Sequence, residues 1–161
     1  MRRRTGAVDN RALESRPDVL VYTSDALVDP LVAIGPVAAD LHVESSLDHT
    51  DFFVRLCDVA PDGTSRNVCD GLRRFDPSTI RRDPDGAFRA SVPMWPAGHR
   101  FAAGHRIRVQ VSSGAHPVYA RNLGTGEPAA TATAMRAADQ AVHHQPGRLS
   151  SVSLPHARVR L

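Results

Sequence analysis

The sequence contains no lysine, few aromatic residues and no long apolar run. All 20 basic residues are arginine, and 17 acidic residues are interspersed among them. A domain that binds nucleic acid gathers its basic residues beside aromatic side chains that stack on bases, whereas aromatic residues here make up 5% of the chain. A membrane-spanning helix needs roughly 18 consecutive apolar residues, and the sequence has no such stretch. We therefore expect neither nucleic acid nor a membrane as a partner.

Cysteine is scarce as well, with Cys57 and Cys69 on either side of a Pro-Asp-Gly turn. If Val59 pairs with Ser65 across that turn, Cys57 lies opposite Asn67 and Cys69 lies diagonally on the same face. A disulfide at a diagonal position would be strained, and the basic first residues lack the apolar stretch of a secretion signal. We therefore predict two free, partly buried thiols and, by default, a cytoplasmic protein.

Short apolar segments separated by turn residues make up most of the chain. Its 12 proline and 11 glycine residues are spread at a spacing typical of turns. Within residues 106–112, Ile107, Val109 and Val111 alternate with polar residues, which is the pattern of a strand with one buried face. The segments expected to form strands are 19–22, 31–34, 37–44, 52–59, 67–75, 87–94, 106–112, 139–144 and 149–154.

Helix signals are weak throughout. Only residues 129–141 have a helix-forming composition, and their alternating threonine and alanine residues favour a loop or at most one short helix. Nine or ten short strands without a crossover helix predict an all-β, antiparallel sandwich. Residues 1–16 carry little apolar pattern, so we interpret them as a lead-in tail or linker and residues 17–161 as the sandwich domain.

The sequence offers no catalytic nucleophile of the α/β-hydrolase type. Such an enzyme needs a Gly-x-Ser-x-Gly turn between a strand and a helix, and the nearest match, around Ser65, lacks the second glycine. The eight histidines raise the possibility of a base or a metal ligand. His143 and His144 are adjacent, so they point to opposite faces of a strand, while His99 and His105 each precede an arginine. None of them has the ligand spacing of a zinc site.

Two acidic turns, at residues 48–51 and 83–86, raise the question of calcium. The second turn has Met94 at the twelfth position, where an EF-hand loop has a bidentate acid. Asx-turn hydrogen bonding explains both turns without a metal, and a structural cation remains the alternative. We assign no catalytic, cofactor-binding or metal-binding residue and expect no cofactor.

Residues 95–127 have the sequence WPAGHRFAAGHRIRVQVSSGAHPVYARNLGTGE. This string resembles the carboxyl-terminal, non-catalytic domain of the family of X-prolyl dipeptidyl aminopeptidases, cocaine esterase and α-amino acid ester hydrolases, the CocE/NonD hydrolases. The resemblance covers residues 9–155, because similar strings follow in the family's order. These strings are 9–22, 32–45, 50–59, 61–63, 67–71, 142–144 and 153–155.

The resemblance implies a jelly-roll β-sandwich of the galactose-binding-domain type. In this family a preceding α/β-hydrolase domain holds the Ser-His-Asp triad, and the sandwich packs on it, walls part of its pocket and supports dimerisation. Two departures stand out: residues 1–6 replace a glycine-rich lead-in, and residues 148–150 replace a His-Pro-Ser turn. No triad residue carries over to this sequence. The chain therefore resembles a fragment of a longer enzyme, or the product of a truncated or split gene.

The leading hypothesis is an accessory domain of a serine hydrolase that acts on esters, amides or X-Pro peptides, inactive by itself. The alternative is a free-standing module that binds carbohydrate or another ligand, although Trp95, Tyr22 and Tyr119 are more easily interpreted as core or corner residues than as stacking platforms. A third option is an independent enzyme. The strand at 52–59 carries apolar residues on both faces, so Phe53 either meets a partner or a second copy or lies under a surface loop.

Overall fold

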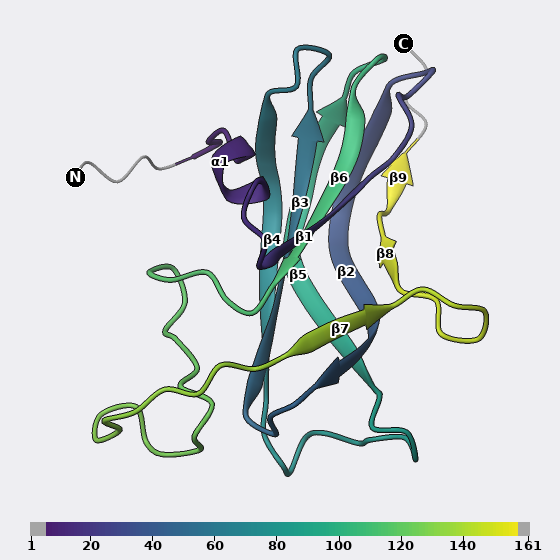
Figure 1. Ribbon diagram of the computed structural model, residues 1–161. Helices are drawn as coiled ribbons and strands as arrows, with labels where there is room; N and C mark the ends of the chain where they lie inside the picture. Colours follow the sequence, from purple (N-terminus) through teal and green to yellow (C-terminus); the bar gives the residue numbers. More distant parts are fainter. Residues whose placement is uncertain (1–5, 158–161) are drawn as a thin grey trace.

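The computed structural model describes residues 6–157 as two antiparallel sheets packed face to face (Figure 1). The first sheet has the order β1-β6-β3-β4, and in the second β2 lies between β5 and a row of three short strands. An all-β sandwich is therefore confirmed. The finer assignment to a jelly roll stays a prediction. The first-sheet strands are β1 (Val19–Thr23), β6 (Arg106–Ser112), β3 (Thr50–Val59) and β4 (Ser65–Phe75); the second-sheet strands are β5 (Phe88–Phe101), β2 (Leu31–Ser45), β7 (Gln140–His143), β8 (Ser151–Ser153) and β9 (His156–Ala157).

The core lies between the two sheets and follows the period-2 pattern of the strands. Phe52, Val54 and Leu56 of β3 are buried there, opposite β2 and β5. Phe52, Phe75 and Phe88 form a cluster of edge-to-face rings whose centroids lie 5.3–6.2 Å apart. Burying each such side chain contributes about 2–3 kcal/mol. These contacts make the interior of the sandwich apolar throughout.

The segments 31–34 and 37–44, expected as two strands, form the single long strand β2. Its register against β5 shifts between Gly35 and Val37, which is a bulge rather than a break. Gly35 has a φ of 125°, and a Cβ there would lie 3.2 Å from the Pro155 ring. β5 likewise runs on to Phe101, past the expected end of a strand at Met94. Bulges let one strand change direction without ending.

A second bulge, between Leu56 and Cys57, places the two cysteines on different faces. Val59 pairs with Ser65 and Cys57 with Asn67, as predicted, but Leu56 then pairs with Cys69. Cys69 therefore belongs to the core cluster, and the predicted diagonal position on the face of Cys57 is wrong. Both thiols are free and buried. Burial raises the pKa of the Cys57 thiol to about 12 and that of Cys69 to about 11.

The lead-in is attached to the first sheet from Val8 onwards. It contains α1 (Arg11–Glu14), the only helix within residues 6–157, and Asp9 forms a bridge with Arg66 of β4. The segment 129–141, in contrast, has no helix. The domain bounds of 1–16 and 17–161 stay a prediction, but the described part of the lead-in is not a free tail.

Candidate functional site

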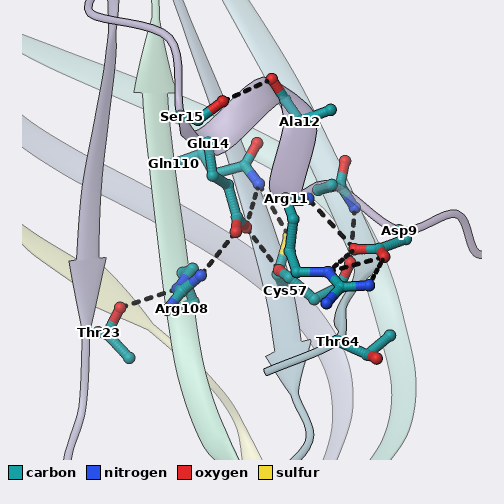
Figure 2. A network of polar contacts seen from close by, with 12 residues as sticks. Asp9, Arg11, Ala12, Glu14, Ser15, Thr23, Cys57, Thr64, Arg108 and Gln110 are labelled. Carbon is teal, nitrogen blue, oxygen red and sulfur yellow. Dashed lines mark hydrogen bonds and ion pairs between the residues drawn. The ribbon is translucent and has the colours of Figure 1, made fainter. Parts of the chain in front are cut away.

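One half of the outer face of the first sheet is polar and is covered by α1. Glu14 projects from α1 onto this face, where its side chain is 6% exposed. Its carboxylate accepts hydrogen bonds from Ser65 Oγ at 2.5 Å, Arg108 Nη1 at 2.6 Å and Gln110 Nε2 at 2.7 Å (Figure 2). Gln110 Nε2 also lies 3.3 Å from Cys57 Sγ. The Glu14 carboxylate, buried beneath the helix, thus accepts three hydrogen bonds, which offset the cost of removing it from water.

Asn10 anchors the residues that precede α1. It is fully buried, and its backbone N–H donates to the carbonyl of Ser65 at 2.8 Å. Its side-chain oxygen accepts a hydrogen bond from Arg55 Nη1 at 2.9 Å, and Arg55 also pairs with Asp70. The segment is therefore held by polar groups rather than by apolar packing. Because this attachment uses no apolar residues, Asn10, Glu14 and Gln110 were not predicted from the sequence. Gln110, the one glutamine among the arginines on the outer face of its strand, was the only signal.

A loop at residues 113–122 covers the other half of the same face. Asp51, itself 2% exposed, receives two hydrogen bonds from the Arg74 guanidinium and one from Asn122 Nδ2 at 2.7 Å. Arg74 also donates to the carbonyl of Ala120 at 2.7 Å. One buried carboxylate thereby fixes the loop to β3 and β4.

Phe53 lies under this loop and is 3% exposed. Its ring centroid is 6.0 Å from that of Tyr119 and 5.0 Å from Arg55 Cζ. The alternative that Phe53 lies under a surface loop is therefore confirmed, and its ring is not an exposed contact for a partner. The second apolar face of β3 packs within the domain.

Between α1 and the loop lies a cleft with a volume of about 500 Å³. Leu13 and Arg16 line one side, Val118 and Tyr119 the other, and Phe53 lies at its floor. A second hollow of about 190 Å³ adjoins β4 and is lined by Leu72, Trp95 and again Tyr119. Trp95 is 70% exposed and lies inside the continuous strand β5, so its interpretation as a core or corner residue is wrong.

His99 and His105 converge on Asp58. His99 Nε2 lies 2.8 Å from Asp58 Oδ2, and His105 Nδ1 lies 2.7 Å from Oδ1. Each histidine precedes an arginine in the sequence, but in the fold both imidazoles contact a carboxylate from β3. His143 and His144 make separate contacts, as expected: His143 Nε2 is 3.6 Å from Glu44, and His144 Nε2 is 2.9 Å from the hydroxyl of Tyr22.

The acidic turns are occupied by arginine side chains. Asp48 pairs with Arg82 at 2.8 Å, and Asp85 pairs with Arg148. Across residues 6–157, no three histidine, cysteine or acidic side chains are grouped so as to hold a metal ion. In the same described residues, no helix has the length and apolar character to cross a membrane.

Ser65, the nearest match to a hydrolase nucleophile in the sequence, has a buried hydroxyl that donates a hydrogen bond to Glu14.

The sequence that folds into this sandwich matches a known class of domain. The model of the X-Pro dipeptidyl-peptidase C-terminal non-catalytic domain matches residues 3–153. The chain therefore belongs to this family of non-catalytic domains, which the CocE/NonD hydrolases contain.

Relatives of known sequence and structure agree with this assignment. Cocaine esterase from Rhodococcus sp. (strain MB1 Bresler) is 36% identical over 159 residues, covering 93% of this chain and 27% of the esterase. An α-amino acid ester hydrolase superposes with a TM-score of 0.83 at 29% identity, covering 94% of this chain and 27% of that one. An aminopeptidase from the marine sediment archaeon Thaumarchaeota archaeon superposes with a TM-score of 0.81 at 27% identity, covering 94% of this chain and 28% of the aminopeptidase. The chain thus spans about a quarter of the length of these relatives.

Proposed function

We propose that this chain serves as the accessory domain of a serine hydrolase that acts on esters, amides or X-Pro peptides, and that an α/β-hydrolase domain is its partner. The observation that carries the proposal is the family match over residues 3–153, together with the span of about a quarter of each hydrolase relative. The geometry is compatible with it, since the buried Ser65 hydroxyl is bonded to Glu14 rather than to a histidine base.

In this role the domain packs on the hydrolase domain, forms part of the wall of its substrate pocket and supports a dimer. Acyl transfer needs a nucleophile, a base and an oxyanion hole, which the partner domain would supply. The sandwich contributes shape and rigidity. Its loop at 113–122 is suited to this task because Asp51 fixes it from below.

A domain replacement in the Rhodococcus cocaine esterase tests the proposal. The region of the esterase that this chain matches is exchanged for the whole chain, and the melting temperature and rate of ester hydrolysis are compared with those of the esterase lacking that region. We expect the fusion to be more stable and more active than the truncated enzyme, and the isolated chain to show no turnover. A fusion no better than the truncated enzyme would count against the accessory role.

The exposure of Trp95 supports one second candidate, a module that binds carbohydrate. An exposed indole offers a flat face for a sugar ring, and Asp70 lines the same hollow as a hydrogen-bond acceptor. Calorimetry with neutral oligosaccharides distinguishes the two functions. Saturable binding by the isolated chain that is lost in Trp95→Ala would favour the module; heat changes equal to those of dilution would rule it out for the sugars used.

A further inference from the structure

We propose that the hydrolase domain docks on the outer face of the first sheet, across the cleft between α1 and the loop at 113–122, and past the edge strand β4 as far as Trp95 on β5 of the second sheet. We call this area the α1–Trp95 face. The inference rests on the proposed function and adds to it the surface through which the partner binds. Three observations carry it: the gathering of exposed apolar side chains, the place where the chain enters the domain, and the rigidity of the covering elements.

Exposed apolar side chains border both hollows of this face. Leu13 on α1 is 44% exposed, Val118 on the loop 72%, and Trp95 on β5 70%. Tyr119 lines both the cleft and the hollow beside β4, so it connects Leu13 and Val118 with Trp95. Large exposed apolar side chains that lie together mark interaction sites, whereas scattered ones do not.

Charged groups surround this apolar area. Arg16, Asp18 and Arg121 line the cleft together with His116. Apolar anchors inside a polar, water-accessible rim are the usual composition of an interface between domains that also exist as folded units. The face therefore fits a folded protein domain better than a membrane or a single small ligand.

The direction of the chain identifies the occupant. In a C-terminal domain the catalytic part precedes the sandwich, so it is joined through the lead-in. Val8 donates to Asn67, and Asn10 and Glu14 bind the first sheet, so the lead-in lies on the α1–Trp95 face. Figure 1 shows α1 and the loop after β6 on one side of the sandwich, with β8 and β9 on the other. A domain tethered on this side meets this face at high effective concentration.

The elements that form the face are held in place before any partner arrives. Glu14 fixes α1 through three hydrogen bonds. Asp51 fixes the loop through Arg74 and Asn122. A surface already ordered by buried polar networks loses little conformational entropy when it binds. These networks thus act as supports of the docking surface.

Hydrogen exchange on the esterase fusion and on the isolated chain tests the location. We expect slower exchange in the fusion at residues 8–16 and 113–122, and unchanged exchange at β7, β8 and β9. Slower exchange confined to β7, β8 and β9 would overturn the assigned surface while leaving the proposed function intact. Equal exchange everywhere, in a fusion as unstable as the truncated enzyme, would reject both. Protection that depends on protein concentration would indicate a second copy on this face and would also reject the inference.

Paired substitutions provide an independent test. Leu13→Ser with Trp95→Ser alters the proposed face. Ile34→Ser with Leu149→Ser alters positions that are 61% and 67% exposed, one on β2 and the other in the segment before β8. All four side chains are exposed, so both pairs should leave the melting temperature of the isolated chain nearly unchanged. In the fusion, the first pair should lower the melting temperature by about 4 °C or more and reduce hydrolysis several-fold, whereas the control pair should not. Equal effects of the two pairs in the fusion would overturn the inference.

Discussion

His99 on β5 and Asp58 on β3 are joined by a contact of 2.8 Å that connects the two sheets of the sandwich. His105, which immediately precedes β6, contacts the other oxygen of the same carboxylate. The chain passes from β5 of the second sheet to β6 of the first sheet between these two histidines. Asp58 therefore contacts the segments before and after this connection. The cluster joins the sheets at this end of the sandwich through polar contacts, next to the buried ring of Phe101.

Replacing Asp58 with alanine should therefore destabilise the domain. The side chain is 12% exposed, and its loss leaves two partly buried imidazoles without their acceptor, which costs about 1–3 kcal/mol. Urea unfolding of Asp58→Ala, His99→Ala and the double variant measures the coupling between the residues. Additive effects of the single changes would show that the contact contributes nothing, and the exposed Asp29→Ala provides a control.

Gly71→Ala should be among the most damaging single substitutions in the chain. A Cβ at Gly71 on β4 would lie 2.2 Å from the carbonyl oxygen of Pro93 on β5, where the edges of the two sheets approach each other. The three atoms nearest to such a Cβ all belong to the backbone of Pro93 and Met94, so the strands must separate, at a cost of about 1–3 kcal/mol or more. Gly98→Ala is the matched control, because a Cβ there meets nothing within 4 Å. Equal melting temperatures for the two variants would contradict the expectation.

Glu14→Ala should loosen the lead-in from the first sheet. Arg108 and Gln110 lose a buried acceptor, and we expect a loss of about 2–3 kcal/mol in the free energy of unfolding. Asp18→Ala removes an acid from the exposed pair with Arg16 and should leave that free energy unchanged within error. Limited proteolysis gives a second measurement, with cleavage in residues 8–16 accelerated only in Glu14→Ala. An intact lead-in in that variant would show that α1 is held by other contacts.

The strands and the sandwich were predictable from the sequence because burial on one face imposes a period of two. Phe52, Val54 and Leu56 face the core as their alternation indicates. The position of Cys69 was not predictable, because a single bulged residue reverses every side chain that follows it. Nothing in the local sequence distinguishes such a bulge from a regular pair. The same limit applies to β2, where a Gly-Pro step looked like a break and proved to be a bulge.

The outer face of the first sheet was beyond prediction for another reason. Its parts come from distant segments: Glu14 meets Gln110, and Asp51 meets Asn122. Periodicity tells which side of a strand is apolar, but not which loop returns to cover it. Phe53 could therefore be assigned equally to a partner or to a loop until the fold placed Tyr119 above it. Polar contacts between such segments leave no pattern along the chain.

The two cysteines give a prediction about pH. Burial raises the pKa of Cys57 to about 12 and that of Cys69 to about 11, from the usual value of 9.0. Above about pH 9 the unfolded chain releases both thiol protons while the native protein retains them, so these groups lower the free energy of unfolding as the pH rises towards 11. Below pH 9 their contribution does not change with pH, because both states are protonated.

Urea unfolding between pH 8 and pH 11 checks this expectation, with Cys57→Ala/Cys69→Ala as the matched variant. The wild-type protein should lose more stability over this range than the variant, and the difference isolates the thiols from other groups that titrate there. Native protein at pH 8 should also react slowly with a thiol reagent, because the thiolate is the reactive form, and denatured protein should show two free thiols. Parallel pH profiles for the two proteins, or rapid labelling of the native fold, would mean that the thiols are more accessible than their place in the sandwich implies.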